Sequence, residues 1–422
     1  MRVTLLNTFH RSGGAAVAAN RLHQAFLQHG LDSTLLTGAP TQQEKRLEAP
    51  SVVSLADSFW GDQLAFARFV GERLYFLPYE KNKAVRFHFS PAKFGADLAS
   101  HPAVQQADVL HLHWINFGFL SLNGLDDLLR LGKPVVWTLH DTWPFTGGCH
   151  YPRGCEQFKT HCHQCPYLRK PGQHDLAYRI FRRKTELLKG ARIHFTPPSR
   201  WMQQEAQSGT LLRDFPFTVI PNPVDQTVFA PQPPDAAAKL PELSADRPRL
   251  LFGSANTTDP RKGFAFFVEA LRILKQHYQG KEPEIILFGK SNAAYLADVP
   301  YPVRSLGVLR TEEAVAAAYN AADALVVPSL EDNLPNTIAE ALSCGTPVVG
   351  FNTGGIPEMI DHQQNGYLAS AGSAASLAQG LAWLLNHADP ARLRQQARLS
   401  AERRYSGAVI TRQFNELYHS FL

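Results

Sequence analysis

The chain has 422 residues, which is enough for two or three domains with sizeable cores. Its 44% hydrophobic and 19% charged residues are ordinary for a globular enzyme, and a net charge of +5 is too small to indicate nucleic-acid binding by itself. No run of about 18 apolar residues predicts a membrane-spanning helix, and the apolar segment at residues 1–9 is too short for a signal peptide. We therefore expect a cytoplasmic protein, associated at most peripherally with the inner face of a membrane.

The first part of the chain alternates strands with helices. Residues 3–6 predict a strand, a turn with Gly13 and Gly14 follows, and residues 18–28 and 33–37 predict a helix and a second strand. The turn lacks the dinucleotide fingerprint G-x-G-x-x-G, so taken alone it indicates only a tight turn. Residues 40–105 are hard to interpret, and their aromatic side chains either line an acceptor-side insertion or simply pack; they include Phe59, Trp60, Phe66 and Phe69.

Two further strands are predicted at residues 108–113 and 134–139. The second strand delivers His140 and Asp141 at its carboxyl end, which is the end where open α/β sheets bind ligands. We interpret His111 and His113 as structural residues of the first strand. Trp114, Asn116 and Trp143 stand where they could shape an acceptor pocket.

Four of the five cysteines fall within 17 residues, at Cys149, Cys155, Cys162 and Cys165. A terminal C-x-x-C with two earlier thiols predicts a loop folded around a structural zinc ion, with His150, His161 or His163 as replacement ligands. Two alternatives remain open, namely reduced packing cysteines without metal and disulfide or redox chemistry.

A basic segment follows, with eight Lys or Arg against two acids between residues 167 and 194. Tyr178, Phe181 and Leu188 interleave with these cations. A basic amphipathic helix over residues 169–192 would suit an anionic bilayer or a lipid-linked diphosphate. The competing interpretation is a solvated helix whose apolar side packs on its own domain.

The second half restarts the strand and helix alternation after a proline-rich hinge at residues 218–225. Strands are predicted at residues 250–254 and 284–288, with a helix at 264–277 between them. Arg261 and Lys262 stand just before that helix. The forked guanidinium of the arginine and the compact ammonium of the lysine are suited to binding two phosphate groups. Residues 306–309 predict a short strand or loop, and Thr311 and Glu312 open a helix to residue 321.

The stretch 323–366 is the most informative part of the chain. Residues 323–327 form a continuous apolar run, typical of a parallel strand buried on both faces. Pro335 suits a first helical turn, residues 336–344 are helical in composition, and Gly345 with Pro347 indicates a stop. A strand at 347–351 follows, and residues 352–357 are predicted to start another helix. Two amide-rich helix N-termini would then lie side by side and form an anion site.

Polar residues of the helix 336–344 fall at three- and four-residue spacing, namely Asn336, Thr337, Glu340 and Ser343, with Asp332 just before it. Taken alone, this is a solvated polar face with a capping acid. The wider pattern begins with an acid, which is followed after seven further residues by Glu340. The sequences Ala-Leu-x-Cys-Gly-Thr-Pro-Val-Val and Gly-Gly-x-Pro-Glu358 come next. This wider pattern resembles the nucleotide-sugar site of the family 4 retaining glycosyltransferases. The segment His-Asp-Thr-Trp-Pro-Phe-Thr-Gly-Gly-Cys-His-Tyr with the cysteine loop resembles a subgroup acting on exopolysaccharides such as colanic acid.

The resemblance assigns roles to individual residues of this sequence. Glu340 would bind the donor ribose, and Asp332, where the family usually has Glu, would face the donor sugar together with His140. The remaining donor-binding positions implied by the resemblance are Gly13, Gly14, Arg261, Lys262, Val308, Asn333, Leu334 and Thr337. No Asp-x-Asp triplet occurs, so no metal is expected in catalysis.

The resemblance implies an α/β protein of GT-B architecture, with two Rossmann-like domains facing each other across a cleft. We expect an acceptor-side domain at residues 1–220, a nucleotide-sugar domain at 226–400 and a helix at 401–422 that crosses back. The expected activity is sugar transfer from a nucleotide diphosphate sugar to a saccharide or lipid-linked saccharide, in cell-surface polysaccharide biosynthesis. Two alternatives are a GT-B phosphorylase or sugar epimerase, and a zinc-bearing nucleic-acid-binding protein. The last one leaves the pattern at 250–368 unexplained, so we expect no nucleic-acid partner.

Overall fold

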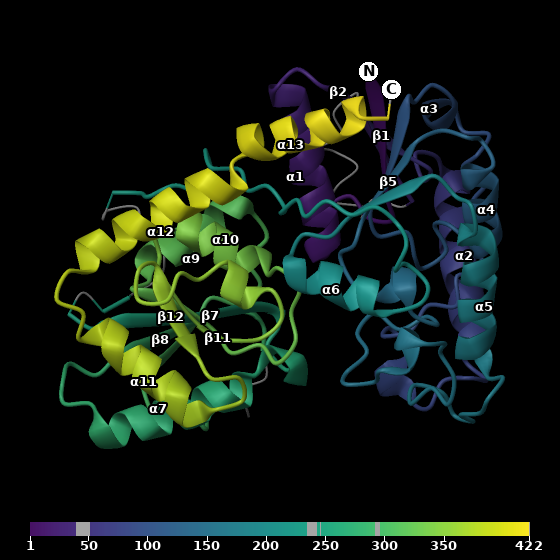
Figure 1. Cartoon of the computed structure of the whole chain (residues 1–422). Coiled ribbons are helices and arrows are strands. Elements are labelled where there is room, and N and C mark those ends of the chain that lie inside the picture. The colour runs from purple at the N-terminus through teal and green to yellow at the C-terminus, as the bar shows by residue number, and fades with distance from the viewer. Residues whose placement is uncertain (39–50, 234–242, 245, 292–295, 422) are drawn as a thin grey trace. The chain divides into compact units, whose positions relative to one another are not determined.

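The computed structural model describes residues 1–38, 51–233, 243–244, 246–291 and 296–421. The chain divides into two compact units, the first formed by residues 1–221 and 410–422 and the second by residues 222–409. Each unit contains one six-stranded parallel sheet flanked by helices (Figure 1). Residues 40–50 of the segment that the sequence leaves open lie outside the described residues.

The sheet of the first unit has the strand order β3-β2-β1-β4-β5-β6. Its strands are β1 (Arg2–Asn7), β2 (Asp32–Thr37), β3 (Val52–Ser54), β4 (Val109–Leu112), β5 (Val135–Thr138) and β6 (Ile193–Thr196). The continuous apolar character of β4 and β5 is explained by burial at every position. The strand order reverses between β1 and β4, which creates a topological switch point at their carboxyl ends.

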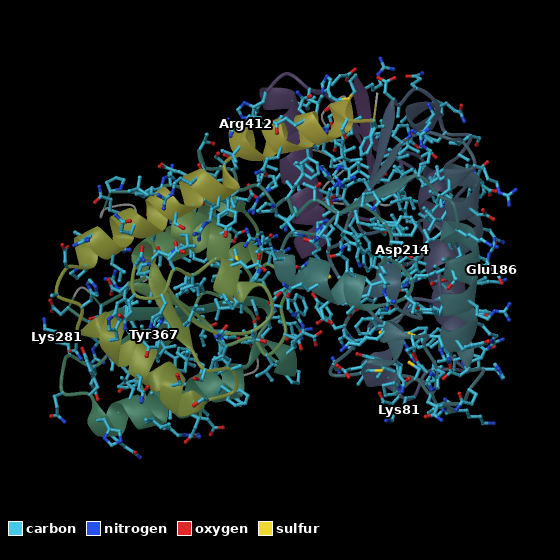
Figure 2. The ribbon with its side chains drawn as sticks, viewed as in Figure 1. Lys81, Glu186, Asp214, Lys281, Tyr367 and Arg412 are labelled. Carbon is cyan, nitrogen blue, oxygen red and sulfur yellow. The ribbon has the colours of Figure 1, made fainter. Side chains whose placement is uncertain are left out.

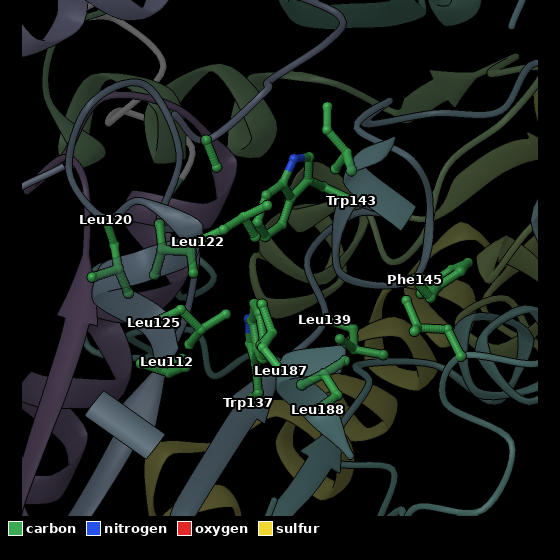
Figure 3. Close-up of a cluster of buried hydrophobic side chains, with 14 of the residues drawn as sticks. Leu112, Leu120, Leu122, Leu125, Trp137, Leu139, Trp143, Phe145, Leu187 and Leu188 are labelled. Carbon is green, nitrogen blue, oxygen red and sulfur yellow. The ribbon is translucent and has the colours of Figure 1, made fainter. Parts of the chain in front are cut away.

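Helices cover both faces of this sheet (Figure 1). They are α1 (Gly14–Gln28), α2 (Phe59–Phe76), α3 (Pro102–Gln105), α4 (Leu122–Leu129), α5 (Leu176–Leu188), α6 (Arg200–Ser208) and α13 (Gly407–His419), with short 3-10 turns η2 (Lys83–Val85), η3 (Trp143–Phe145) and η4 (Gln157–Lys159). On one face, Phe26 of α1 and Phe414 of α13 pack with Val3 of β1. On the other face, strand residues such as Trp137 pack against Leu125 of α4 and Leu187 of α5 (Figure 3).

The sheet of the second unit has the order β12-β11-β10-β7-β8-β9, so its switch point lies between β10 and β7. The strands are β7 (Arg249–Asn256), β8 (Glu284–Lys290), β9 (Val303–Ser305), β10 (Ala324–Val327), β11 (Val348–Phe351) and β12 (Gly366–Ala369). The helices are α7 (Phe264–His277), α9 (Glu312–Ala321), α10 (Asn336–Ser343), α11 (Ala374–Leu385) and α12 (Pro390–Tyr405), with 3-10 turns η6 (Pro260–Lys262) and η7 (Ile356–Glu358).

The helix expected after β11 does not form. Only the 3-10 turn η7 is present, because the side chain of Asn365 accepts the backbone N–H of Asp361 at 2.9 Å and turns the chain away from a helical path. The prediction of two adjacent α-helix N-termini was therefore wrong. Pro335 also lies one position before α10, with an extended ψ of 119°, and not inside its first turn.

Residues 374–419 form the three helices α11, α12 and α13, and the helix expected at residues 401–422 is interrupted at Ser406. Tyr405 ends α12, Ser406 has an extended ψ of 143°, and α13 begins at Gly407. The C-terminal helix of the second unit and the segment that joins the first unit are therefore separate elements. Within the described residues, the helices are too short or too polar to cross a bilayer.

Candidate active site

The strongest candidate site in the second unit lies at the switch point between β7 and β10. Lys262, in the loop after β7, places its Nζ 2.6 Å from Oδ2 of Asp332, in the loop after β10. Arg261 places its NH1 3.5 Å from the same carboxylate oxygen and donates to the backbone carbonyl of Glu331 at 2.8 Å. The structure thus brings together both cations and the first carboxylate of the predicted donor site.

Two glycines let the loops around this cluster approach closely. At Gly263, with φ of 71°, an added Cβ would lie 1.8 Å from the carbonyl oxygen of Pro328. At Gly354, with φ of 57°, a Cβ would lie 1.9 Å from the carbonyl oxygen of Asp332. The next amide, on Gly355, donates to that same oxygen at 3.0 Å. Only glycine provides both the positive φ and the space at these positions.

The electrostatics of the cluster favour an ionised acid beside two cations. Burial opposes ionisation of Asp332, but the neighbouring Lys262 and Arg261 hold its pKa below the ordinary value. The carboxylate is almost fully buried, whereas Lys262 and Arg261 keep part of their side chains exposed. The exposed parts of the two cations can therefore accept a further anion.

Glu340 lies on the helix that follows. Its side chain is buried, and Oε2 accepts a hydrogen bond from the hydroxyl of Tyr319 on α9 at 2.8 Å. On the same helix, Asn336 accepts from the Nδ2 of Asn222 at 3.2 Å, and Thr337 is partly exposed. Tyr319 is a site residue that the sequence did not indicate, because a tyrosine on an alanine-rich helix looks like core.

The other donor-binding positions also fall on loops of this edge. Asn333 and Leu334 are buried between β10 and α10. Val308 follows the edge strand β9 and is well exposed, with 58% of its side chain accessible. An exposed valine beside the carboxyl end of a sheet is a suitable surface for a flat ring to lie on.

In the first unit, His140 follows β5 and contacts His113, which follows β4. Nδ1 of His113 lies 2.9 Å from Nε2 of His140, and the two rings stack at 5.2 Å. Within the described residues, Nε2 of His113 is buried without a hydrogen-bond partner. Burying an acceptor without a partner costs less free energy than burying such a donor, so we assign the proton of His113 to Nδ1 and leave its Nε2 as the unpaired acceptor. Nδ1 of His113 then donates to Nε2 of His140, so the proton of His140 is on its own Nδ1. Burial lowers the pKa of His140 to about 4, which keeps the ring neutral.

Asp141 connects this edge of the sheet to the cysteine loop. Its Oδ2 accepts from Nε1 of Trp114 at 2.8 Å and pairs with Nδ1 of His150 at 2.7 Å. Nε2 of His150 in turn lies 2.9 Å from the hydroxyl of Ser90. Burial opposes ionisation of Asp141, but His150 and donors from Trp143 and Trp114 hold its pKa below the ordinary value. Both nitrogens of His150 are engaged, so the prediction that it replaces a cysteine ligand was wrong.

His111 and the Gly13–Gly14 turn complete the edge. His111 is buried and bonds Thr138 of β5 at 2.8 Å and the hydroxyl of Tyr418 at 2.7 Å, which confirms a structural role. Gly13 has φ of 93° and lies exposed directly before α1, where a Cβ would meet nothing within 4 Å. Gly13 and Gly14 thus form an exposed turn at the N-terminus of α1.

The four clustered cysteines line one small apolar cavity with Phe89, Phe158 and Tyr167. Gly147 donates its backbone N–H to the sulfur of Cys162 at 3.0 Å, and burial raises the pKa of Cys149 to about 12. Among the described residues, no three His, Cys, Asp or Glu side chains stand close enough together to hold a metal ion. Zinc binding would require the thiols to draw together, and it stays a prediction.

Helix α5 uses its apolar side inside the first unit. Ile180, Phe181 and Leu187 are buried, and Lys184 is buried with them. Nζ of Lys184 donates to the carbonyl oxygens of Trp143 and Thr146 and lies over the Trp143 ring. The outward residues, such as Glu186 labelled in Figure 2, are charged. The packed-helix interpretation therefore holds for α5, which cannot lay its apolar side on a bilayer.

Comparison with known proteins identifies the class. Residues 12–228 match the family model described as Glycosyltransferase Family 4, and residues 247–387 match the model described as Glycosyl transferases group 1. The two six-stranded parallel sheets with their helices have the GT-B fold, as the sequence predicted, and the family models make the chain a glycosyltransferase. The chain belongs to glycosyltransferase family 4.

Two relatives are named for polysaccharide biosynthesis. The chain is 26% identical over 373 residues, covering 85% of both proteins, to the putative colanic acid biosynthesis glycosyl transferase WcaC of Escherichia coli K12. It is 31% identical over 183 residues to the amylovoran biosynthesis glycosyltransferase AmsK of Erwinia amylovora, covering 40% of this chain and 44% of AmsK.

Solved structures share the fold over the whole chain. Sucrose-phosphate synthase from Thermosynechococcus elongatus superposes with a TM-score of 0.65 at 19% identity, covering 100% of this chain and 99% of that one. HepE of Anabaena, solved in complex with UDP-glucose, has a TM-score of 0.65 at 17% identity and covers 100% of both chains.

Proposed function

We propose that this glycosyltransferase takes its sugar from a nucleotide diphosphate sugar and transfers it, with retention at the anomeric carbon, to a saccharide or lipid-linked saccharide in cell-surface polysaccharide biosynthesis. The observation that carries the proposal is the pairing of Lys262 and Arg261 with Asp332 at the switch point of the second sheet. The UDP-glucose bound by HepE and the polysaccharide pathways of WcaC and AmsK support it.

The cations are the groups suited to the donor diphosphate. Arg261 offers a planar fork and Lys262 a compact point charge, and both side chains are partly exposed. As the diphosphate leaves, it gains negative charge, which these two residues stabilise without a metal ion. When phosphate oxygens take the Lys262 ammonium, the Asp332 carboxylate is released to accept hydroxyls of the donor sugar.

Glu340 and His140 complete the proposed arrangement. Glu340 is held by Tyr319 through one oxygen and can accept the two ribose hydroxyls through the carboxylate. His140, neutral near pH 7 and carrying its proton on Nδ1, can donate a hydrogen bond to a sugar hydroxyl. We also propose that the enzyme contacts the membrane, because a lipid-linked acceptor is held there.

A thermal-shift titration with UDP, GDP, ADP and CMP tests the donor proposal. We expect one nucleoside diphosphate to raise Tm, and the double substitution Arg261→Ala with Lys262→Ala to abolish the rise. Arg272→Ala is the matched control, since Arg272 lies exposed on the adjoining helix α7 and pairs with Glu269. A wild-type protein that responds to none of the nucleotides would contradict the proposal.

Product analysis then separates transfer from its rivals. The enzyme is incubated with the stabilising nucleotide's sugar conjugate and an acceptor, with or without inorganic phosphate. We expect the α-linked donor sugar to appear in an α-linkage on the acceptor by NMR. A sugar 1-phosphate would indicate a phosphorylase, and a changed sugar without an acceptor product would indicate an epimerase.

A further inference from the structure

Helix α2 exposes three of its aromatic side chains. Among the described residues, most of the well-exposed large apolar side chains of the chain lie between residues 59 and 94. Trp60 is 73% exposed, Phe59 69% and Phe66 64%. At 100° per residue, these three fall on one side of the helix with Leu64 and Leu74. We call these five residues the apolar face of α2.

The rest of the same helix buries charge. Glu72 is completely buried and accepts the backbone N–H groups of Ala92, Lys93 and Phe94 at 2.7, 2.9 and 3.2 Å. Arg73 is 9% exposed and donates to the carbonyl oxygen of Phe89 at 3.1 Å. Buried charges with this many partners fix the rotation of α2 about its axis, because turning the helix would leave both ions without their hydrogen-bond partners. The outward apolar face is therefore built into the fold.

Exposed lysines, which we call the lysine border, follow α2 in the chain. Segment 59–94 contains six Lys or Arg and three acids, and Glu72 and Glu80 among the acids are buried and paired. Lys81, Lys83 and Lys93 are exposed, and Lys81 lies at the edge of the first unit in Figure 2. The segment 59–94 thus combines exposed apolar side chains with a net positive charge.

A basic groove adjoins the helix. It has a volume of about 280 Å³ and is lined by Tyr75 of α2, Lys93, Asn123 of α4, and Arg179 and Arg183 of α5. Figure 1 shows α2, α4 and α5 side by side on one face of the first sheet. Arg183 pairs with Asp126 at 2.9 Å, whereas Arg179 is exposed and lies over the ring of Tyr79. Such a groove suits a phosphate group of a lipid.

Aromatic side chains lead from this surface to the candidate site. Phe69 of α2 and Phe87 both contact the ring of Phe117, at 6.1 and 6.0 Å. Phe117 contacts Trp114 at 4.7 Å, and Trp114 donates to Asp141 beside His140. Packed rings therefore connect α2 and the exposed Phe87 to the sheet edge that holds His140.

We propose that the apolar face of α2 and its lysine border form the surface by which the enzyme lies on an anionic lipid bilayer. Aromatic and leucine side chains at the level of the headgroups, with flanking lysines, are the usual composition of an interfacial helix. The bilayer fits better than a second copy of the chain, because a self-pairing of this surface would bring its lysines against each other. The proposal rests on the proposed function in one respect, since a membrane-held acceptor gives the contact its purpose.

Vesicle flotation of the full chain tests the proposal. We expect binding to phosphatidylcholine vesicles containing about one third phosphatidylglycerol, weaker binding to phosphatidylcholine alone, and further weakening by salt. Trp60→Ser with Phe66→Ser should reduce binding about tenfold or more. Lys81→Glu with Lys83→Glu should remove the preference for the anionic vesicles. The control is Leu27→Ser with Leu399→Ser, two exposed leucines on α1 and α12 that should leave flotation unchanged.

Three results would overturn the proposal. These are a wild type that floats with neither vesicle, an aromatic variant that binds like the wild type, and a wild-type dimer in solution that the aromatic substitutions convert to monomer. The nucleotide thermal shift is measured on the same variants, and a shift kept in the aromatic variant shows that it is folded. A wild type that floats with vesicles but shows no thermal shift with any nucleotide contradicts only the proposed function. A wild type that responds to a nucleotide but does not float contradicts only the proposed membrane surface.

Discussion

The ammonium of Lys262 lies 2.6 Å from the Asp332 carboxylate, although the two residues are 70 positions apart in the chain. This ion pair joins the loops after β7 and β10 across the switch point of the second sheet. It means that a cation expected to hold phosphate is already engaged by the enzyme's own acid. Donor binding then involves an exchange of anions at Lys262.

Replacing the carboxylate by an amide should separate binding from turnover. In Asp332→Asn, the cations lose their internal partner, so we expect UDP to bind about three- to tenfold more tightly by calorimetry. Sugar transfer should fall at least about tenfold, because the group proposed to face the sugar has lost its charge. Asp361→Asn is the matched control, since Asp361 forms an Asp–Arg pair with Arg404 away from the site. Unchanged UDP affinity in Asp332→Asn would show that the carboxylate does not compete with phosphate.

Gly354 tests the close approach of the two loops. Gly354→Ala combines a positive φ with a Cβ 1.9 Å from the Asp332 carbonyl oxygen, so it should displace the loop, lower Tm and weaken nucleotide binding. Gly372 has a similar φ of 69°, but a Cβ added there would meet no atom within 4 Å, so Gly372→Ala should cost only about 1 kcal/mol of conformational strain. Equal loss of nucleotide binding in both variants would mean that the clash has no special effect.

The histidines of the first unit predict a pH dependence of stability. Burial lowers the pKa of His140 to about 4 from its ordinary 6.5, so the unfolded chain binds the proton between these values and the folded chain does not. Stability is therefore lost as pH falls from 6.5 towards 4 and is unaffected by this group above 6.5. We expect the decline of Tm between pH 7 and pH 5 to be shallower in His140→Gln than in the wild type. His161→Gln, at an exposed histidine, should follow the wild type.

Metal analysis tests the prediction of structural zinc. Four thiols line one cavity, and we expect about one zinc per chain by mass spectrometry of the purified protein, lost in Cys149→Ser and Cys165→Ser. Cys344→Ser is the control, because Cys344 is also buried but lies at the end of α10 in the second unit. A wild-type protein without zinc would contradict the zinc prediction and favour the interpretation that the cysteines are reduced and only pack. A mass lowered by two protons would indicate a disulfide.

Much of the fold follows from simple patterns in the sequence. The buried parallel strands are visible as apolar runs, and α7 lies at residues 264–277 as predicted, because Gly263 before it and its apolar periodicity act locally. The helix expected after β11 failed because a residue beyond the predicted segment intervenes, since the side chain of Asn365 accepts the backbone N–H of Asp361. Helix α2 could not be predicted from its pattern, because it buries Glu72 and exposes Trp60, which is the reverse of an ordinary amphipathic helix.

The residues of the candidate site could be proposed from the sequence, but their contacts could not. The spacing around Asp332 and Glu340 is a local motif, so resemblance was enough to select them. The partners come from elsewhere in the fold: His113 was taken for a strand residue, and it contacts His140 because β4 and β5 are neighbours. Likewise, Tyr319 reaches Glu340 from a different helix. Such pairs depend on strand order, which no single segment encodes.

The helix α13 has a consequence for how the protein is made. Phe414 and Tyr418 pack with Val3 and Phe26, and Tyr418 bonds His111 in the first unit. A chain emerging from the ribosome therefore completes its second unit before the last piece of the first unit exists. Until α13 is synthesised, the apolar side chains around Phe26 on this face of the first sheet stay uncovered. Such an exposed apolar surface is a suitable binding site for a chaperone. Closure of the sheet that contains Val3 depends on residues translated after the whole second unit.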